Sequence, residues 1–169
     1  MRLYLVRHGA AVDRNEFTGP DEDRPLTTKG RWELFRLFRS LRGHEDPPEE
    51  IWTSPVVRAV QTAEICALQW GGDAPVKVSR ALTSDTPFAT LLDEIAKANP
   101  KSPLAVVGHE PQLGQLLTHL TGAKTALALP KGSMCRVRYR LEDQPPGRFT
   151  CLHVAGTDEV VVEFEKLFR

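Results

Sequence analysis

The chain has 169 residues, 41% of them hydrophobic, which is enough for one globular domain with a full core. Its 22 basic and 22 acidic side chains cancel, and this balance argues against a general binder of nucleic acid or of membrane surfaces. The scattered cysteines, the short apolar runs and the lack of a signal-peptide pattern predict a cytoplasmic protein, a single domain over residues 1–169, with reduced thiols and no transmembrane segment.

Strand and helix patterns alternate along the chain. The predicted strands cover 2–7, 50–53, 75–79 and 104–107, followed by a hairpin of 134–141 and 148–153. The predicted helices cover 28–41, a segment from 55 onward, 87–98, 111–121 and the tail 158–168. Ser54 is expected to cap the second helix and Gly122 to end the fourth. This alternation predicts a three-layer α/β/α sandwich, with a mostly parallel central sheet and helices on both faces.

Arg7-His8-Gly9 follows the first strand directly and is the first candidate for chemistry. Ligands of open α/β sheets bind at the carboxyl ends of the strands, which is where these side chains are expected. Arginine forms bidentate bonds to phosphate, and a neutral histidine offers a nitrogen nucleophile. The alternative is a loop histidine and a surface arginine after a buried strand.

Two further segments point to the same edge of the sheet. Arg58 lies in the first turn of the second predicted helix, where the helix dipole favours an anion. His109 follows the strand 104–107 at a strand-to-helix turn. Taken alone, Arg58 is typical of an exposed helical arginine and His109 of a structural histidine. Two histidines at two strand ends, with two arginines able to converge on them, favour a phosphoryl site.

Four pieces of the sequence together resemble the histidine phosphatase (phosphoglycerate mutase-like) superfamily. In chain order they are Leu5-Val6-Arg7-His8-Gly9, Arg24-Pro25-Leu26-Thr27-Thr28-Lys29-Gly30, Ser54-Pro55 through Arg58 to Gln61-Thr62-Ala63, and Gly108-His109. The short length and the Arg-Pro-Leu-Thr segment are most similar to SixA-type phosphohistidine phosphatases. The resemblance implies a phosphoglycerate mutase-like fold and phosphorylation of His8. It also implies that Arg7, Arg58 and His109 surround the transferring phosphoryl group.

The expected chemistry needs neither a metal nor a cofactor. A phosphoryl group in transfer spreads negative charge over its oxygens, which two arginines and a second histidine can stabilise. His8 must be neutral to attack, and a hydrogen bond from its other ring nitrogen to a backbone carbonyl would fix the tautomer. The sequence has no Gly-rich phosphate loop and no metal-ligand spacing among its histidines. The other three histidines are interpreted as structural or exposed: His44, His119 and His153.

The general acid that would protonate the leaving group is left open. Asp85 lies in the segment where superfamily members that act on phosphate monoesters usually carry this carboxylate; its alternative role is N-cap of the helix near Pro87. Glu110 is a second candidate, and its alternative role is a favourable charge at a helix start. Arg24 is a candidate for substrate contact or a surface arginine ahead of a helix cap. SixA-like members depart from the acid pattern, because the N–P bond of phosphohistidine already has a reactive leaving group.

The segment between Arg58 and His109 also indicates a substrate class. The predicted elements fill it and leave little chain for a lid, so we expect an open, shallow site that admits a side chain on a protein surface. The sequence therefore predicts a metal-independent phosphatase that acts on a phosphohistidine-bearing protein. The alternatives are a small-molecule phosphomonoesterase of the same superfamily and a noncatalytic phospho-ligand or phosphoprotein-binding module.

Overall fold

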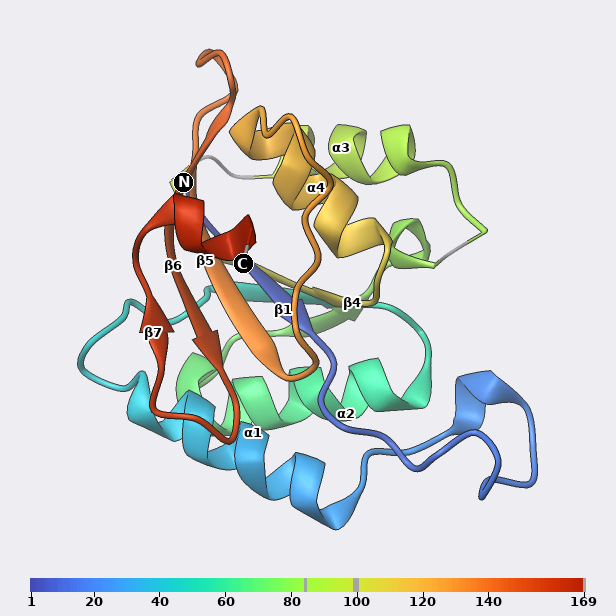
Figure 1. Cartoon of the computed structure of the whole chain (residues 1–169). Coiled ribbons are helices and arrows are strands. Elements are labelled where there is room, and N and C mark those ends of the chain that lie inside the picture. Colours follow the sequence, from blue (N-terminus) through green and yellow to red (C-terminus); the bar gives the residue numbers. More distant parts are fainter. Residues whose placement is uncertain (84, 99–100, 169) are drawn as a thin grey trace.

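The structure, a computed structural model, describes residues 1–83, 85–98 and 101–168. A seven-stranded sheet runs through the centre of the molecule in the order β3-β2-β4-β1-β5-β6-β7 (Figure 1). The strands are β1 (Arg2–Arg7), β2 (Glu50–Thr53), β3 (Val76–Val78), β4 (Leu104–Gly108), β5 (Ser133–Tyr139), β6 (Gly147–Val154) and β7 (Val160–Val161).

The sheet is parallel in one half and antiparallel in the other. Strands β3, β2, β4 and β1 pair in parallel, as connections through helices require. Strand β5 then pairs antiparallel with β1, and β6 and β7 continue antiparallel. The predicted α/β sandwich is confirmed, and the expectation of a mostly parallel sheet describes only the four strands β1 to β4.

Two helices cover each face of the sheet (Figure 1). The helices are α1 (Thr28–Ser40), α2 (Val57–Cys66), α3 (Phe88–Lys97) and α4 (Gln112–Thr121). Successive side chains of a strand point to opposite faces. Leu3 and Leu5 of β1 therefore join the core under α3 and α4, whereas Tyr4 and Val6 join the core under α1 and α2. None of the described helices is long and apolar enough to cross a bilayer.

Of the two helix ends predicted from the sequence, one is correct and one is wrong. Gly122 ends α4 in the left-handed conformation (φ 67°), as predicted. The prediction that Ser54 caps the second helix is wrong, because α2 begins at Val57 and its N-cap, Val56, makes no side-chain cap bond. The backbone N–H of Ser54 instead donates to the carbonyl of Val107 (3.0 Å), which continues the strand pairing for one more residue.

The tail is the second departure from prediction. Instead of one helix over 158–168, Val160 and Val161 form β7 on the free edge of β6, and Phe164–Phe168 forms a 3-10 turn. An open strand edge presents unpaired backbone groups, and two β-branched residues satisfy some of them better as a strand than as a helix.

The parallel strands bring three segments of the chain to one edge of the sheet. Strand β4 lies between β1 and β2, in a register that aligns Arg7 with Gly108 and Thr53 with Val107. The residues directly after the three strands, His8, Ser54 and His109, therefore lie beside one another. The backbone N–H of His8 donates to Gly108 (3.1 Å), which extends the ladder into the site.

Candidate active site

His8 is buried at the carboxyl end of β1, with one ring nitrogen held by the backbone. Its Nδ1 lies 2.8 Å from the carbonyl oxygen of Gly9. A carbonyl only accepts hydrogen bonds, so Nδ1 carries the proton and Nε2 keeps its lone pair. Burial, followed by the charges of Arg58 and Arg7, lowers the pKa of His8 to about 4. The predicted bond to a backbone carbonyl is present, and the geometry gives a neutral imidazole with a free Nε2.

The guanidinium groups of Arg7 and Arg58 are each hydrogen-bonded at one end only. Arg7 donates from Nη1 to the carbonyl of Leu129 (2.5 Å), and Arg58 donates from Nη1 and Nη2 to Asp21. The Nε atoms of both arginines are buried without a hydrogen-bond partner among the described residues. Buried N–H donors are nearly always paired, so two orphans beside His8 indicate a place for an anion.

His109 lies against His8, with the ring centroids 5.0 Å apart. Its Nε2 is 3.0 Å from Oγ of Ser54, while Nδ1 is buried with no partner in the described part of the chain. Burial, the neighbouring His8 and the arginines lower the pKa of His109 to about 3. The ring is therefore neutral at physiological pH, and when Ser54 donates to Nε2 the proton of His109 resides on Nδ1.

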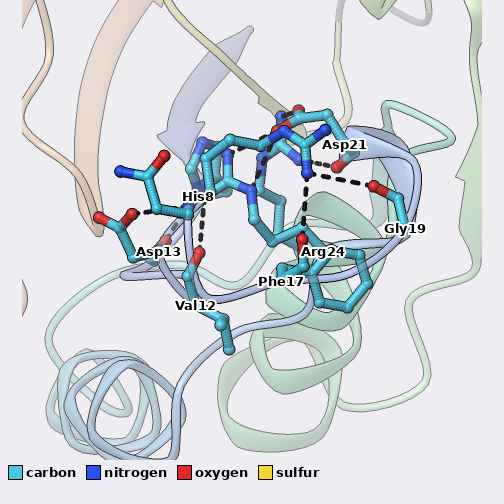
Figure 2. Close-up of polar contacts among 11 residues, drawn as sticks. His8, Val12, Asp13, Phe17, Gly19, Asp21 and Arg24 are labelled. Atoms are coloured by element: carbon cyan, nitrogen blue, oxygen red, sulfur yellow. Dashed lines mark hydrogen bonds and ion pairs between the residues drawn. The ribbon is translucent and has the colours of Figure 1, made fainter.

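Asp21 connects Arg58 to Arg24. It lies in a 3-10 turn, Asp21–Asp23, of the loop between β1 and α1, and it contacts Arg58 through both its carbonyl (2.7 Å) and its carboxylate (2.9 Å). Arg24 donates from Nε to the same carboxylate (3.0 Å) and from Nη1 to the carbonyl of Val12 (2.8 Å), so it lies behind Asp21 (Figure 2). Arg58 and Arg24 hold the pKa of Asp21 below its usual value, against the effect of its partial burial.

The two candidate acids take different positions. Asp85 is exposed, and a hydrogen bond from Thr83 lowers its pKa. It does not cap α3, because the N-cap position is Pro87, which has no side-chain cap bond. Glu110 accepts from the backbone N–H of Leu129 (2.9 Å), the residue whose carbonyl holds Arg7. Its carboxylate therefore acts on Arg7 indirectly, by holding the residue that binds Arg7.

A cavity of about 590 Å³ opens beside these residues. Its lining includes Ser54, Arg58 and His109, with carboxylates from Asp21, Asp85 and Glu110. Within the segment between Arg58 and His109, α2, β3, α3 and β4 take up much of the chain, and the cavity lining includes Thr83 and Asp85. The loop before α1 walls one side of the cavity with Asp21–Asp23.

The structure thus brings together Arg7, His8, Arg58 and His109, with Asp85 and Glu110 at the cavity and Arg24 behind it. Sequence reasoning missed two residues of this arrangement, Asp21 and Ser54. Ser54 gave a signal, since it directly follows a strand as His8 and His109 do. Asp21 gave none, because a loop rich in Asp, Gly and Pro does not indicate which carboxylate turns inward.

The sequence and the fold of the chain are both similar to known proteins. The sequence pattern of the Histidine phosphatase superfamily (branch 1) matches residues 3–83. An uncharacterised protein of Picosynechococcus sp. strain PCC 7002 is 39% identical over 117 residues, which cover 68% of this chain and 70% of that protein. Phosphohistidine phosphatase SixA of Escherichia coli K12 is 28% identical over 128 residues, which cover 74% and 77% of the two chains.

Solved structures extend the likeness to nearly the whole chain. The protein histidine phosphatase SixA complexed with tungstate superposes with a TM-score of 0.79 at 25% identity, over 91% of this chain and 97% of that one. The α-ribazole phosphatase of Shigella flexneri shares the fold, with a TM-score of 0.69 at 15% identity over 96% and 100%. The matched residues 3–83 hold Arg7, His8 and Arg58, and the wider alignments reach past His109. The chain is therefore a member of the histidine phosphatase superfamily.

Proposed function

We propose that this phosphatase dephosphorylates a phosphohistidine side chain on a protein, through a phosphorylated His8 and without a metal ion. The observation that carries the proposal is the set of groups around the His8 ring. Its Nε2 keeps its lone pair, and the charges of Arg7 and Arg58 act on the ring. The Nε–H groups of both arginines are buried without a partner among the described residues. A nucleophile among unpaired donors is suited to a phosphoryl group, whose oxygens would satisfy those donors.

The reaction follows from these contacts in two transfers. Nε2 of His8 attacks the phosphorus, and the bond between phosphorus and the nitrogen of the substrate histidine breaks. The departing substrate imidazole takes a proton from solvent. Arg7 and Arg58 bind the equatorial oxygens, and Nδ1–H of His109 donates to a third. Water then attacks phosphorus, which releases inorganic phosphate and returns His8 to its neutral form. Asp21 holds the outer edge of Arg58 and so points Nε inward.

The carboxylates around the cavity support an N–P substrate. A general acid for an alkoxide leaving group needs a pKa raised toward neutrality. The charge of Arg58 lowers the pKa of Asp21, and a hydrogen bond from Thr83 lowers that of Asp85. Glu110 accepts a hydrogen bond from Leu129. An imidazole leaves without strong acid help, so this set of carboxylates suits phosphohistidine better than a sugar phosphate. The likeness to SixA supports the same substrate class.

Trapping the intermediate tests the nucleophile. After brief exposure to labelled phosphohistidine protein and denaturation, an acid-labile, alkali-stable adduct should map to His8. His8→Ala should lose both adduct and turnover. A label on Ser, Asp or Cys, or full activity of His8→Ala, would end the proposed mechanism.

A substrate panel tests the substrate class. Phosphohistidine proteins should be hydrolysed well, an activated aryl phosphate moderately, and sugar phosphates and nucleotides poorly. Chelators should leave these rates unchanged, whereas vanadate or tungstate should inhibit by occupying the phosphoryl site. Efficient hydrolysis of an unactivated small ester would favour the small-molecule phosphatase, and binding without turnover the noncatalytic module.

A further inference from the structure

Three side chains with metal-binding atoms meet outside the candidate active site. Glu45 lies in the loop after α1, while Cys151 and His153 lie two residues apart on β6 and so share one face of that strand. One donor atom of each lies within 4.8 Å of the others. The cluster sits two strands away from β1, which carries the catalytic candidates.

The backbone around Glu45 is fixed by its neighbours. Its N–H donates to Leu41 at the end of α1 (2.9 Å), and its carbonyl accepts from Nε1 of Trp70 (3.3 Å). The Glu45 side chain is therefore delivered to β6 by ordered backbone rather than by a free loop. Such positioning is what a binding site requires, because the ligand geometry must exist before the ion arrives.

The two oxygens of the Glu45 carboxylate have different partners. Oε2 pairs with Nη1 of Arg136, whose Nε is held by Oγ1 of Thr150 (3.0 Å). Oε1 faces Sγ of Cys151 at 3.9 Å. Arg136 thus occupies one oxygen and leaves the other directed at the thiol. The 3.9 Å between Oε1 and Sγ is close to the separation of two ligands on one tetrahedral zinc ion.

Access to the cluster comes from the side of His153. This residue lines a hollow of about 490 Å³ between α1 and the end of β6, together with Trp32, Arg36 and Ser40. Cys151, by contrast, is only 3% exposed. An ion could therefore enter past His153 and meet the buried sulfur last.

We propose that Glu45, Cys151 and His153 bind a single zinc-type divalent ion, with its fourth position open to the hollow. Zinc prefers thiolate, imidazole and carboxylate in tetrahedral arrangement, whereas Mg²⁺ and Ca²⁺ need mainly oxygen ligands. On binding, the S–H bond of Cys151 breaks, the proton passes to solvent and an S–Zn bond forms, with no change of oxidation state.

Without the ion, the Cys151 thiol donates its hydrogen bond to Oε1 of Glu45. The bound ion would pin the loop after α1 to β6, and its role would be to stabilise the fold rather than to take part in catalysis.

Metal titration of the intact, reduced protein tests the site. After removal of bound metal, Zn²⁺ should bind at one ion per chain and raise the unfolding temperature. Co²⁺ in its place should give a thiolate charge-transfer band. Cys151→Ser and His153→Ala should each weaken binding more than about a hundredfold, since loss of even an outer partner costs roughly ten- to a hundredfold. Cys151→Ser should also remove the charge-transfer band.

The controls separate this site from the phosphatase site and from general metal affinity. His119→Ala changes an exposed histidine on α4 and should bind Zn²⁺ as the wild type does. His153→Ala, at a half-buried position, should keep wild-type phosphatase turnover, so that failure here leaves the proposed function untouched. Absence of stoichiometric binding, or equal binding by His153→Ala and the wild type, would reduce the cluster to a hydrogen-bonded contact.

Discussion

Arg58 shows how one side chain is shared between structure and chemistry. Its two Nη atoms are bound by Asp21, and its Nε is buried without a partner in the described chain. A buried arginine with a purely structural role would have all of its N–H groups hydrogen-bonded within the protein. This split supports the proposal that the outer edge positions the side chain and the inner edge binds the phosphoryl group.

Replacement of Arg58 by Ala should lower turnover by about two to four orders of magnitude, because charge stabilisation of the transition state is lost. The fold should remain, since Arg58 contributes little to the apolar core. His109→Ala should lower turnover to a similar extent. Steady-state kinetics on an aryl phosphate and circular dichroism measure the two effects. Near-normal turnover of both variants would mean that the phosphoryl pocket lies elsewhere.

A conservative change and a truncation should differ in effect at Glu110. Glu110 accepts from Leu129, which in turn holds Arg7, so its role is to position. Gln keeps an acceptor oxygen, and Glu110→Gln should stay near wild type on all substrates. Glu110→Ala should lower turnover on phosphohistidine and on esters by a similar factor, about ten- to a hundredfold by analogy with outer-shell partners.

Asp85→Asn should spare phosphohistidine and any activated aryl phosphate. On an unactivated ester the same change should also cost little, because a carboxyl group with a lowered pKa is a poor general acid. A working general acid is typically worth about a hundred- to ten-thousand-fold on such a substrate. The measurement is turnover of matched substrates by folded variants. Efficient hydrolysis of a sugar phosphate by the wild type, lost in Asp85→Asn, would overturn the phosphohistidine proposal.

The sequence could predict the residues that follow strands and not those delivered by a loop. His8 and His109 are marked by the buried strands before them, and Arg58 by its place in a first helical turn. Asp21 reaches Arg58 across 37 positions of sequence separation, through a turn with no periodic pattern. The sequence predicts Ser54 as a helix cap, because Ser before Pro is a common helix start. Its contact with His109 depends on strand register, which only the fold determines.

Among the elements, α4 packs directly against the segment 127–129, whose Leu129 carbonyl binds Arg7. A Cβ at Gly114 would overlap the carbonyl oxygen of Leu127 and lie 2.6 Å from Oε2 of Glu110. Neither neighbour can yield freely, because one is backbone and the other is hydrogen-bonded to Leu129. Glycine here allows the helix and the segment 127–129 to touch.

Gly114→Ala should therefore lower the free energy of unfolding by about 1–3 kcal/mol, the usual cost of overpacking. It should also reduce turnover, since displacement of Leu129 moves the anchor of Arg7. Gln115→Ala, on the exposed face of the same helix, is the matched control and should be neutral or slightly stabilising. Urea denaturation with parallel kinetics measures both. Equal stability of the Gly114 variant would show that the segment moves away without cost.

Elements marked by a local apolar pattern are predicted correctly, whereas elements whose form depends on strand pairing are not. The continuous apolar run of β1 and the helical spacing of apolar residues on α1 are strong local signals, and the bounds of both elements agree with prediction within a residue or two. The tail has no such signal, and Val160 and Val161 became a strand because the edge of β6 was open. The antiparallel half of the sheet likewise depends on where the hairpin docks, which a local pattern does not encode.

At the scale of the whole molecule, the fold holds two neutral imidazoles beside two cations. Binding of a phosphoryl dianion would relieve the repulsion between Arg7 and Arg58, whereas in its absence the arrangement is maintained by burial and by Leu129 and Asp21. Protonating either histidine would add a third positive charge to the same pocket. The stability of the protein should therefore respond to acid through these residues.

The sign of that response follows from the pKa values. Burial lowers the pKa of His8 from 6.5 to about 4. Well above pH 6.5 the ring is neutral in both the folded and unfolded chain, so it contributes no pH dependence there. As the pH falls from 6.5 to 4, the unfolded chain takes up a proton that the folded chain does not, and the free energy of unfolding decreases.

His8→Gln should remove this part of the acid sensitivity. The shift of His8 corresponds to a loss on the order of 3 kcal/mol between pH 6.5 and 4 in the wild type, at about 1.4 kcal/mol per pKa unit. Urea denaturation of both proteins from pH 8 to 4 should give curves with a constant difference above pH 6.5. Below that pH the difference between the curves should change by this amount, because only the wild type loses the contribution of His8. If they stay parallel to pH 4, His8 binds its proton equally in both states, and its ring is not held neutral by burial.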